Sequence, residues 1–367
     1  MAPVLKTWAI YERIYIFSLI KFLIFGRRLR LQNIKKILLC FSFALSACDQ
    51  NFMRPVGLDA SGARVSIDGT LSSCGQATQD RFQEFLSEQS AWYSSRNHLR
   101  PTAEHQSVLI LGSEKQAVVL VHGYNSSPFY HQDVIQSLAA AGVTVIAPLV
   151  TGYGSDANAA NEATIDDWRH AVEGAVAVAT TCHKNVALIG HSSGGSLVTH
   201  QLLHFALPGV NKVINLAPFL KSPDSFIADV VHFITARFDV IDVDTFRDVT
   251  GLDPYVVLPF FMPFQNPEPG RPEPYFPLKA LKRVFTLLDA FSDPQPEKST
   301  VSSLLMLTGA DALIDNSFAK EYVSRSFSKN GFFEYPKALN IGHSFQRREN
   351  NPRFDDFMSR LITFIKQ

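Results

Sequence analysis

The sequence predicts an α/β fold, in which a mostly parallel sheet carries helices on both faces. Short apolar runs rich in Val, Ile and Leu alternate with longer segments of helical periodicity along most of 107–367. Runs that are apolar throughout are typical of parallel strands buried on both sides, and their alternation with helices is typical of a parallel sheet. The composition agrees, since 46% of the 367 residues are hydrophobic and 19% are charged. A chain of this kind can bury a large core and is not disordered as a whole.

The expected elements follow one another in chain order. A first helix is expected at 77–93, and two short strands, 107–111 and 117–121, are expected to be joined by a hairpin turn. Further strands are expected at 143–148, 185–190, 213–218, 303–309 and 332–336. Helices are expected at 128–141, 165–181, 196–207, 316–328 and 353–366. Local signals mark several ends, namely Gly142 after one helix and the Thr164/Asp167 capping pair before the next.

The alternation stops between 219 and 300. Residues 254–277 contain eight prolines interleaved with Phe260, Phe261, Phe264 and Phe276. This proline density disfavours a regular helix or a central strand. We expect a cap inserted between two strands of the sheet, whose aromatic side chains line an acyl pocket or form only the cap's own small core.

The N-terminal 47 residues have the pattern of a signal peptide. They hold eight of the 34 basic residues and one of the 34 acidic residues, and a basic stretch precedes the apolar run 37–47 and Cys48. The ending Leu45-Ser46-Ala47-Cys48 resembles the lipobox of bacterial lipoproteins, which implies lipidation of Cys48 and anchoring to a membrane of the bacterial cell envelope, facing the periplasm or the exterior. The alternative is an uncleaved anchor in which Cys48 is an incidental thiol.

Charge and cysteine content exclude other classes. The remaining 320 residues carry 26 basic and 33 acidic side chains, which is a poor footprint for nucleic-acid binding. The four cysteines show no paired CxxC spacing, which excludes a disulfide-dense scaffold and a standard zinc module. After export, Cys74 and Cys182 are expected either to form a disulfide or to stay reduced and buried.

The chain is therefore expected to contain five segments. These are a signal peptide (1–47), a tether with the N-terminal helix (48–106), a first part of the core (107–218), the Pro/Phe-rich cap (219–300) and a second part of the core (301–367).

The strongest chemical signal is Gly190-His191-Ser192-Ser193-Gly194. A buried strand is expected directly before it and a helix directly after it, which is the setting of a nucleophile elbow. Glycines suit this turn because the serine backbone is strained and side chains at 190 or 194 would collide with the adjoining strand and helix.

Ser192 requires a base and an orienting carboxylate. His343 is the single histidine after the cap. Asp311 and Asp315 both follow the expected strand 303–309, and Asp311 is preferred because Asp315 has the sequence context of a helix N-cap. The backbone N–H groups of Tyr124 and Ser193 are expected to form the oxyanion hole, and His122 is expected to shape its loop.

These residues resemble an α/β-hydrolase, closest to the monoacylglycerol lipase and carboxylesterase branch. The matching pieces are LVHGYNSSP (120–128), Gly152-Tyr153-Gly154, Asp167-Trp168, GHSSGG (190–195), GADALID (309–315) and GHS (342–344). The resemblance aligns Asp311 with the family's acid, and Tyr153 departs from the family's usual histidine.

The resemblance implies hydrolysis of a small-molecule or lipid ester by Ser192, His343 and Asp311 through an acyl-enzyme. It implies no metal or organic cofactor and no protein partner. Thioester or amide hydrolysis with the same triad is the close alternative, and a non-catalytic envelope binding protein is the distant one.

Overall fold

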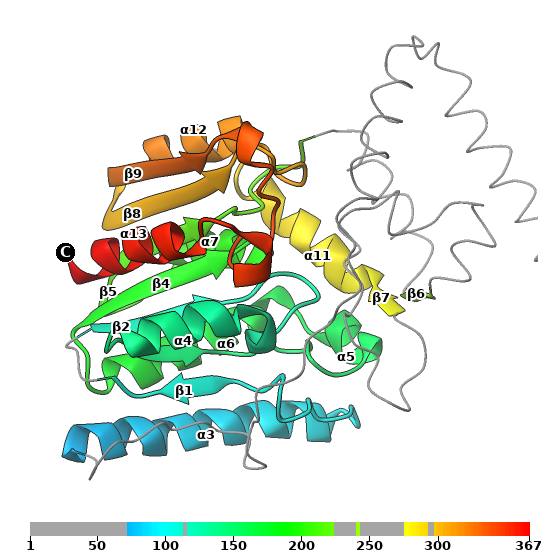
Figure 1. Cartoon of the computed structure of the whole chain (residues 1–367). Coiled ribbons are helices and arrows are strands. Elements are labelled where there is room, and N and C mark those ends of the chain that lie inside the picture. Colours follow the sequence, from blue (N-terminus) through cyan, green and yellow to red (C-terminus); the bar gives the residue numbers. More distant parts are fainter. Residues whose placement is uncertain (1–71, 113–115, 224–239, 243–274, 293–296) are drawn as a thin grey trace, which may run out of the picture. The chain divides into compact units, whose positions relative to one another are not determined.

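The computed structural model describes residues 72–112, 116–223, 240–242, 275–292 and 297–367 (Figure 1). The expected signal peptide, Cys48, Phe260, Phe261 and Phe264 lie outside these residues. The chain divides into two compact units, Met1–Gly57 with Ile241–Tyr275, and Leu58–Val240 with Phe276–Gln367. The large sheet and the candidate-site residues described below belong to the second unit.

A seven-stranded sheet forms the centre of the second unit and confirms the predicted fold class. Its order is β1 (Val108–Ile110), β3 (Thr144–Ala147), β2 (Gln116–Val121), β4 (Asn185–His191), β5 (Val210–Leu216), β8 (Ser299–Thr308) and β9 (Phe327–Tyr335). All neighbouring pairs are parallel except β1 with β3. The central strands β2, β3 and β4 are buried almost throughout, as uninterrupted apolar runs require.

The predicted hairpin between the first two strands is wrong. β1 pairs with β3, in antiparallel register from Val108↔Ala147 to Ile110↔Val145. β2 has no free edge for β1 because it pairs in parallel with β3 on one side and with β4 on the other. β1 therefore pairs with the outer edge of β3. The short chain segment between β1 and β2 does not indicate which strand β1 will pair with.

The strand order fixes the faces that the helices cover. The chain moves one way from β2 to β3 through α4 (Gln132–Ala140), and the opposite way through α6 (Ile165–Thr180) and α7 (Ser193–His204). Since crossovers between parallel strands are right-handed, opposite directions place the helices on opposite faces. The packing agrees, because α13 (Phe354–Lys366) contacts α4 while α6 contacts α7.

The remaining elements are short or lie towards the ends. They are α3 (Ser73–Ser95), η1 (Pro128–His131), α5 (Ala157–Glu162), α12 (Asn316–Ser326), η2 (Lys337–Leu339) and η3 (Arg348–Asn350). No helix of the described ranges is both long enough and apolar enough to cross a bilayer.

The segment between β5 and β8 is an insertion between two strands that pair directly with each other in the sheet. Its described parts include β6 (Val240–Asp242) and β7 (Tyr275–Pro277), which pair with each other, and α11 (Leu278–Asp289). The sequence did not predict α11. The helix starts directly after Pro277, where the proline-rich stretch ends, and its N-terminal N–H groups at Lys279 and Ala280 are bound by the Asn161 side chain at 2.9 and 3.2 Å.

Three predicted signals at helix ends are present, two N-caps and one glycine after a helix. The Thr164 hydroxyl accepts from the Asp167 N–H and the Asp167 carboxylate accepts from the Thr164 N–H, which completes a capping box at the start of α6. The Asp315 carboxylate accepts from the Phe318 N–H at 2.9 Å and begins α12. Gly142 follows α4 with φ +80°, the left-handed conformation of a helix end.

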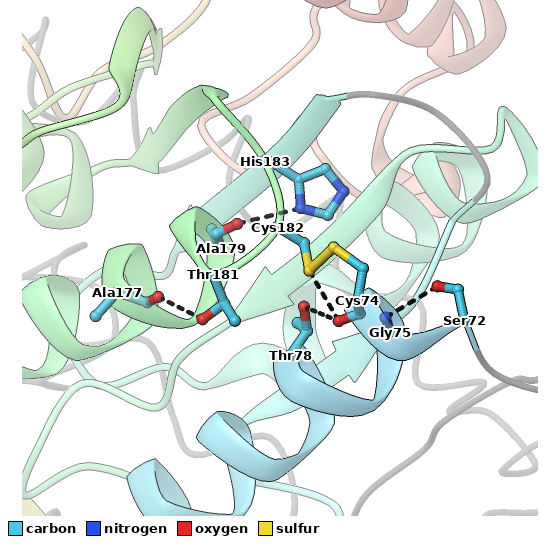
Figure 2. Close-up of a disulfide and its surroundings, with 9 residues drawn as sticks. All are labelled: Ser72, Cys74, Gly75, Thr78, Ala177, Ala179, Thr181, Cys182 and His183. Carbon is cyan, nitrogen blue, oxygen red and sulfur yellow. Dashed lines mark hydrogen bonds between the residues drawn. A yellow bond between two sulfur atoms is a disulfide. The ribbon is translucent and has the colours of Figure 1, made fainter.

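Helix α3 is fastened to α6 and the loop after β3. Figure 2 shows the disulfide between Cys74 at its start and Cys182 after α6, with Cα atoms 5.7 Å apart. The Trp92 indole N–H donates to Asp167 at 3.1 Å. The buried Tyr93 hydroxyl donates to the Tyr153 carbonyl at 2.8 Å. Both ends of the helix are thus joined to the core that carries the candidate site.

Candidate active site

Ser192 occupies a sharp turn between β4 and α7. Its backbone has φ 56° and ψ −125°, a conformation that costs energy for a residue with a Cβ. The Ser192 N–H donates to the Leu216 carbonyl of β5 at 3.0 Å, and the Ser192 carbonyl accepts from Gly195 and Phe219 at 2.9 and 3.0 Å. Bonds from the sheet, the helix and the loop after β5 therefore hold the strained turn.

The glycines around Ser192 leave room for this turn. A Cβ on Gly190 would lie 2.5 Å from the Gly194 carbonyl oxygen, and one on Gly194 would lie 2.3 Å from the His122 carbonyl oxygen. A Cβ on Gly195 would lie 2.7 Å from Cβ of Pro218. The sequence-based steric explanation of the motif thus agrees with the contacts, and the N-terminus of α7 packs directly on the loop after β2.

Asp311 and His343 form a buried pair. His343 Nδ1 lies 2.7 Å from Asp311 Oδ2, and the two side chains are 8% and 0% exposed. A carboxylate accepts, so Nδ1 carries the hydrogen and Nε2 is left to accept a proton. The Leu313 N–H binds the other carboxylate oxygen at 2.8 Å and fixes the acid. Asp315, the alternative acid, is bound to the start of α12 instead.

Ser192 and Asp311 follow two strands of the same sheet, and His343 lies in the loop after η2. β4, which Ser192 follows, is separated from β8, which Asp311 follows, only by β5. His191, the residue before the serine, places its ring centroid 5.0 Å from that of His343. Among the described hydrogen bonds, none joins the Ser192 hydroxyl to the His343 ring. Such bonds often form fully only with substrate present.

The loop after β2 provides the second expected oxyanion donor. A Cβ on Gly123 would lie 3.0 Å from Cβ of Ser192 and 3.6 Å from its Oγ, so this loop runs directly beside the serine. The phenol hydroxyl of the next residue, Tyr124, donates to the Pro277 carbonyl at 3.1 Å, so the expected oxyanion donor of this residue is its backbone N–H. Ser193 is the first residue of α7, where N–H groups have no partner within the helix and favour negative charge.

The loops after β2 and β4 leave the sheet in opposite directions, because β2 leads to β3 on one side and β4 leads to β5 on the other. In open α/β sheets a ligand crevice forms at such a switch point, outside the carboxyl ends of the strands. Ser192 and Tyr124 are therefore where substrate binding is expected from topology alone.

Comparison with known sequences identifies the family. The profile of the Alpha/beta hydrolase family matches residues 118–348, which is more than half of the chain and extends from within β2 to the loop after His343. The chain belongs to the alpha/beta hydrolase family. No curated protein matches it significantly.

Solved structures of lipolytic enzymes share the fold. One, from work on the metagenome-derived lipolytic enzymes LipS and LipT, has a TM-score of 0.56 at 16% identity over 73% of this chain and 99% of its own. The Paleococcus ferrophilus monoacylglycerol lipase has a TM-score of 0.53 at 18% identity over 71% and 97%. A soluble variant of the Saccharomyces cerevisiae monoglyceride lipase has a TM-score of 0.54 at 14% identity over 71% and 91%. At these identities the likeness concerns the fold.

His122 has a structural role in this alpha/beta hydrolase, as expected. Its Nδ1 lies 2.8 Å from the Gly123 carbonyl oxygen, and its Nε2 accepts from the Val150 N–H at 2.9 Å. The ring is 2% exposed, and burial lowers the pKa of His122 to about 3. The neutral ring thus joins the loop after β2 to the loop after β3.

Sequence reasoning missed two histidines near the candidate site. His191 and His131 are both buried, and their ring centroids lie 5.4 Å apart. His191 was visible as the residue before the serine, but its partner His343 is 152 residues away in the chain. In the part of the chain that the structure describes, no three His, Cys, Asp or Glu side chains gather to hold a metal ion.

Proposed function

We propose that this alpha/beta hydrolase cleaves carboxylic esters through an acyl-enzyme, with Ser192, His343 and Asp311 as the catalytic residues. The observation that carries the proposal is the buried Asp311–His343 pair, which lies at the carboxyl ends of the strands, as does the strained Ser192 turn. The bond to Asp311 leaves His343 Nε2 free to accept a proton, and in the proposed reaction it takes that proton from the Ser192 hydroxyl.

The reaction follows from these groups. His343 Nε2 takes the Ser192 proton as Oγ attacks the acyl carbon, and the N–H groups of Tyr124 and Ser193 bind the oxyanion that forms. His343 then gives the proton to the leaving alcohol, and the ester bond breaks to leave acyl-Ser192. A water molecule, deprotonated by His343, then attacks the acyl carbon. The bond from this carbon to Ser192 Oγ breaks, His343 returns the proton to Oγ, and the acid leaves. Asp311 stabilises the imidazolium formed in each half.

We propose lipid-type esters, such as monoacylglycerols, as the substrate class. The GHSSGG and GADALID strings resemble the monoacylglycerol lipase and carboxylesterase branch. Two of the fold neighbours bear the name monoacylglycerol or monoglyceride lipase. Ester, thioester and amide substrates share the same acyl transfer, so the preference among them is an experimental outcome.

Fluorophosphonate labelling followed by peptide mapping tests the mechanism. We expect the label on Ser192 in the wild-type protein and none in Ser192→Ala or His343→Ala. Turnover of matched octanoyl esters, thioesters and amides should fall by several orders of magnitude in both variants, and the double variant should be little worse. Ser87→Ala on the exposed face of α3 is the control and should label normally. Unchanged ester turnover in Ser192→Ala would refute the proposal.

We further propose export and attachment to a bacterial envelope membrane through lipid on Cys48. The lipobox-like ending at Cys48 motivates this, and the Cys74–Cys182 disulfide suits an oxidising compartment. Mass spectrometry should find a mature chain that begins at acylated Cys48, and Cys48→Ser should stay unprocessed while it keeps its esterase activity. Peptides from 1–36 in the membrane-bound protein would contradict this.

A further inference from the structure

His191 lies between two other histidine rings at the end of β4. Its ring centroid is 5.0 Å from that of His343 and 5.4 Å from that of His131, which it meets edge-on at 65°. His131 is held in turn by the Ser127 carbonyl, 3.4 Å from its Nδ1. The proposed mechanism gives no part to either His191 or His131, although both are buried and His191 contacts the base.

The contact between His191 and His343 is also a hydrogen bond. His191 Nε2 lies 3.2 Å from the His343 backbone carbonyl oxygen. A carbonyl only accepts, so His191 must carry its hydrogen on Nε2. Burial lowers the pKa of His191 well below its ordinary value, and the neighbouring His343 and His131 lower it further. The ring is therefore neutral when His343 becomes charged during the reaction.

The backbone of the loop that carries His343 is hydrogen-bonded on both sides of Gly342, and after His343 the Ser344 carbonyl accepts from the Arg347 N–H at 3.2 Å. The buried Thr308 hydroxyl at the end of β8 donates to the Ile341 carbonyl. Gly342 follows, and a Cβ there would meet nothing within 4 Å. The next attachment is the bond from His191 to the His343 carbonyl. Thr308 at the end of β8 and His191 at the end of β4 thus bind the backbone carbonyls that precede and follow Gly342.

We propose that His191 is a positioning residue, which holds the His343 backbone so that the imidazole reaches Asp311 and Ser192. The inference rests on the proposed function. His191 does not touch the substrate or the transferred proton. It acts by removing the freedom that Gly342 allows, and a displacement of about 1 Å in a catalytic group can lower turnover by about a hundredfold.

Three substitutions of His191 distinguish the effect of its hydrogen-bond donor from the effect of its ring. His191→Phe keeps a ring and removes the donor, His191→Gln keeps a donor at the reach of Nε2, and His191→Asn has a donor that is too short. We expect kcat for a short ester to fall about tenfold to a hundredfold in the Phe and Asn variants, with KM within about twofold. The Gln variant should recover most of the rate. His183→Phe, at the opposite end of β4, is the control and should match wild type.

The route of the effect is tested in a His343→Ala background. His191→Phe should cause no further loss of residual turnover there, because a residue that acts through His343 has nothing left to position. A further loss would show that His191 supports the Ser192 turn instead, and would overturn the inference.

The remaining outcomes are also decisive. Wild-type rates of turnover and fluorophosphonate labelling in folded His191→Phe would overturn the inference while leaving the proposed function intact. If His191→Phe does not fold, as judged by thermal melting, the Gln and Asn variants decide, and equal rates for the two would overturn it. Failure of the wild-type protein to label at Ser192 would instead refute the proposed function and, with it, this role.

Discussion

Two aspartates four residues apart have different surroundings. Asp311 places one carboxylate oxygen 2.7 Å from His343 and the other 2.8 Å from the Leu313 N–H. Asp315 accepts from the Phe318 N–H and lies 3.9 Å from the exposed Lys221 ammonium. The first arrangement fixes an imidazole tautomer, and the second begins a helix.

We therefore predict that Asp311→Asn lowers kcat by about 10³–10⁴-fold, because an amide would favour the tautomer that leaves Nε2 protonated. Asp315→Asn should change kcat and the melting temperature little, since asparagine is an equally good N-cap. Steady-state kinetics on one ester, with circular dichroism as a check on folding, measures both. A severe loss in Asp315→Asn would show that the acid is assigned wrongly.

Residue-scale features were predictable where the contacts are local. The Thr164/Asp167 capping box and the Asp315 cap involve residues three apart, so the pattern alone contains both partners. The preference for Asp311 relied on the N-cap context of Asp315 and on the family resemblance, and the structure brings Asp311 to His343. The His191 contact was not predictable, because nothing near it in the chain indicates which loop folds over it.

At the scale of elements, strand positions were predictable and one pairing was not. Apolar runs gave approximate strand positions, and β5, β8 and β9 begin three to five residues before the predicted starts. The β1 pairing depends on competition for edges across the sheet, which no local pattern contains. The Cys74–Cys182 pairing was likewise undecided in the sequence, because it depends on how α3 packs against the end of α6.

The disulfide is predicted to stabilise the fold without affecting catalysis. It closes a loop across a sequence separation of 108 residues, for which chain entropy gives about 4–5 kcal/mol and typical losses are about 2–5 kcal/mol. Cys182 precedes β4, whereas Ser192 follows it, so the two lie at opposite ends of the strand.

Cys74→Ser/Cys182→Ser should therefore lose about 2–5 kcal/mol of unfolding free energy in urea and keep wild-type kcat. Dithiothreitol should lower the stability of the wild-type protein by a similar amount and leave the double variant unchanged. Equal stability of the two proteins under oxidising conditions would show that the bond contributes nothing.

At the scale of the whole molecule, buried neutral histidines should make the free energy of unfolding depend on pH. Burial lowers the pKa of His122 to about 3 and that of His131 to about 4, from the ordinary value of 6.5. His191 shifts in the same direction. All three stay neutral in the folded protein at pH values where they are protonated in the unfolded chain. Below pH 6.5 the unfolded state thus binds more protons than the folded state. The free energy of unfolding therefore decreases as the pH is lowered.

The loss should begin at about pH 6.5 and continue towards about pH 4, with a slope of at most about 1.4 kcal/mol per histidine per pH unit. At about pH 5, His122 and His131 should each have removed about 2 kcal/mol of unfolding free energy. Urea unfolding at about pH 7.5 and about pH 5 measures the total. His131→Phe removes one of these groups and keeps a ring beside His191, so the stability difference between the two pH values should shrink by about 2 kcal/mol relative to wild type. An unchanged difference would mean that His131 is protonated in the folded protein at about pH 5 and would contradict the prediction.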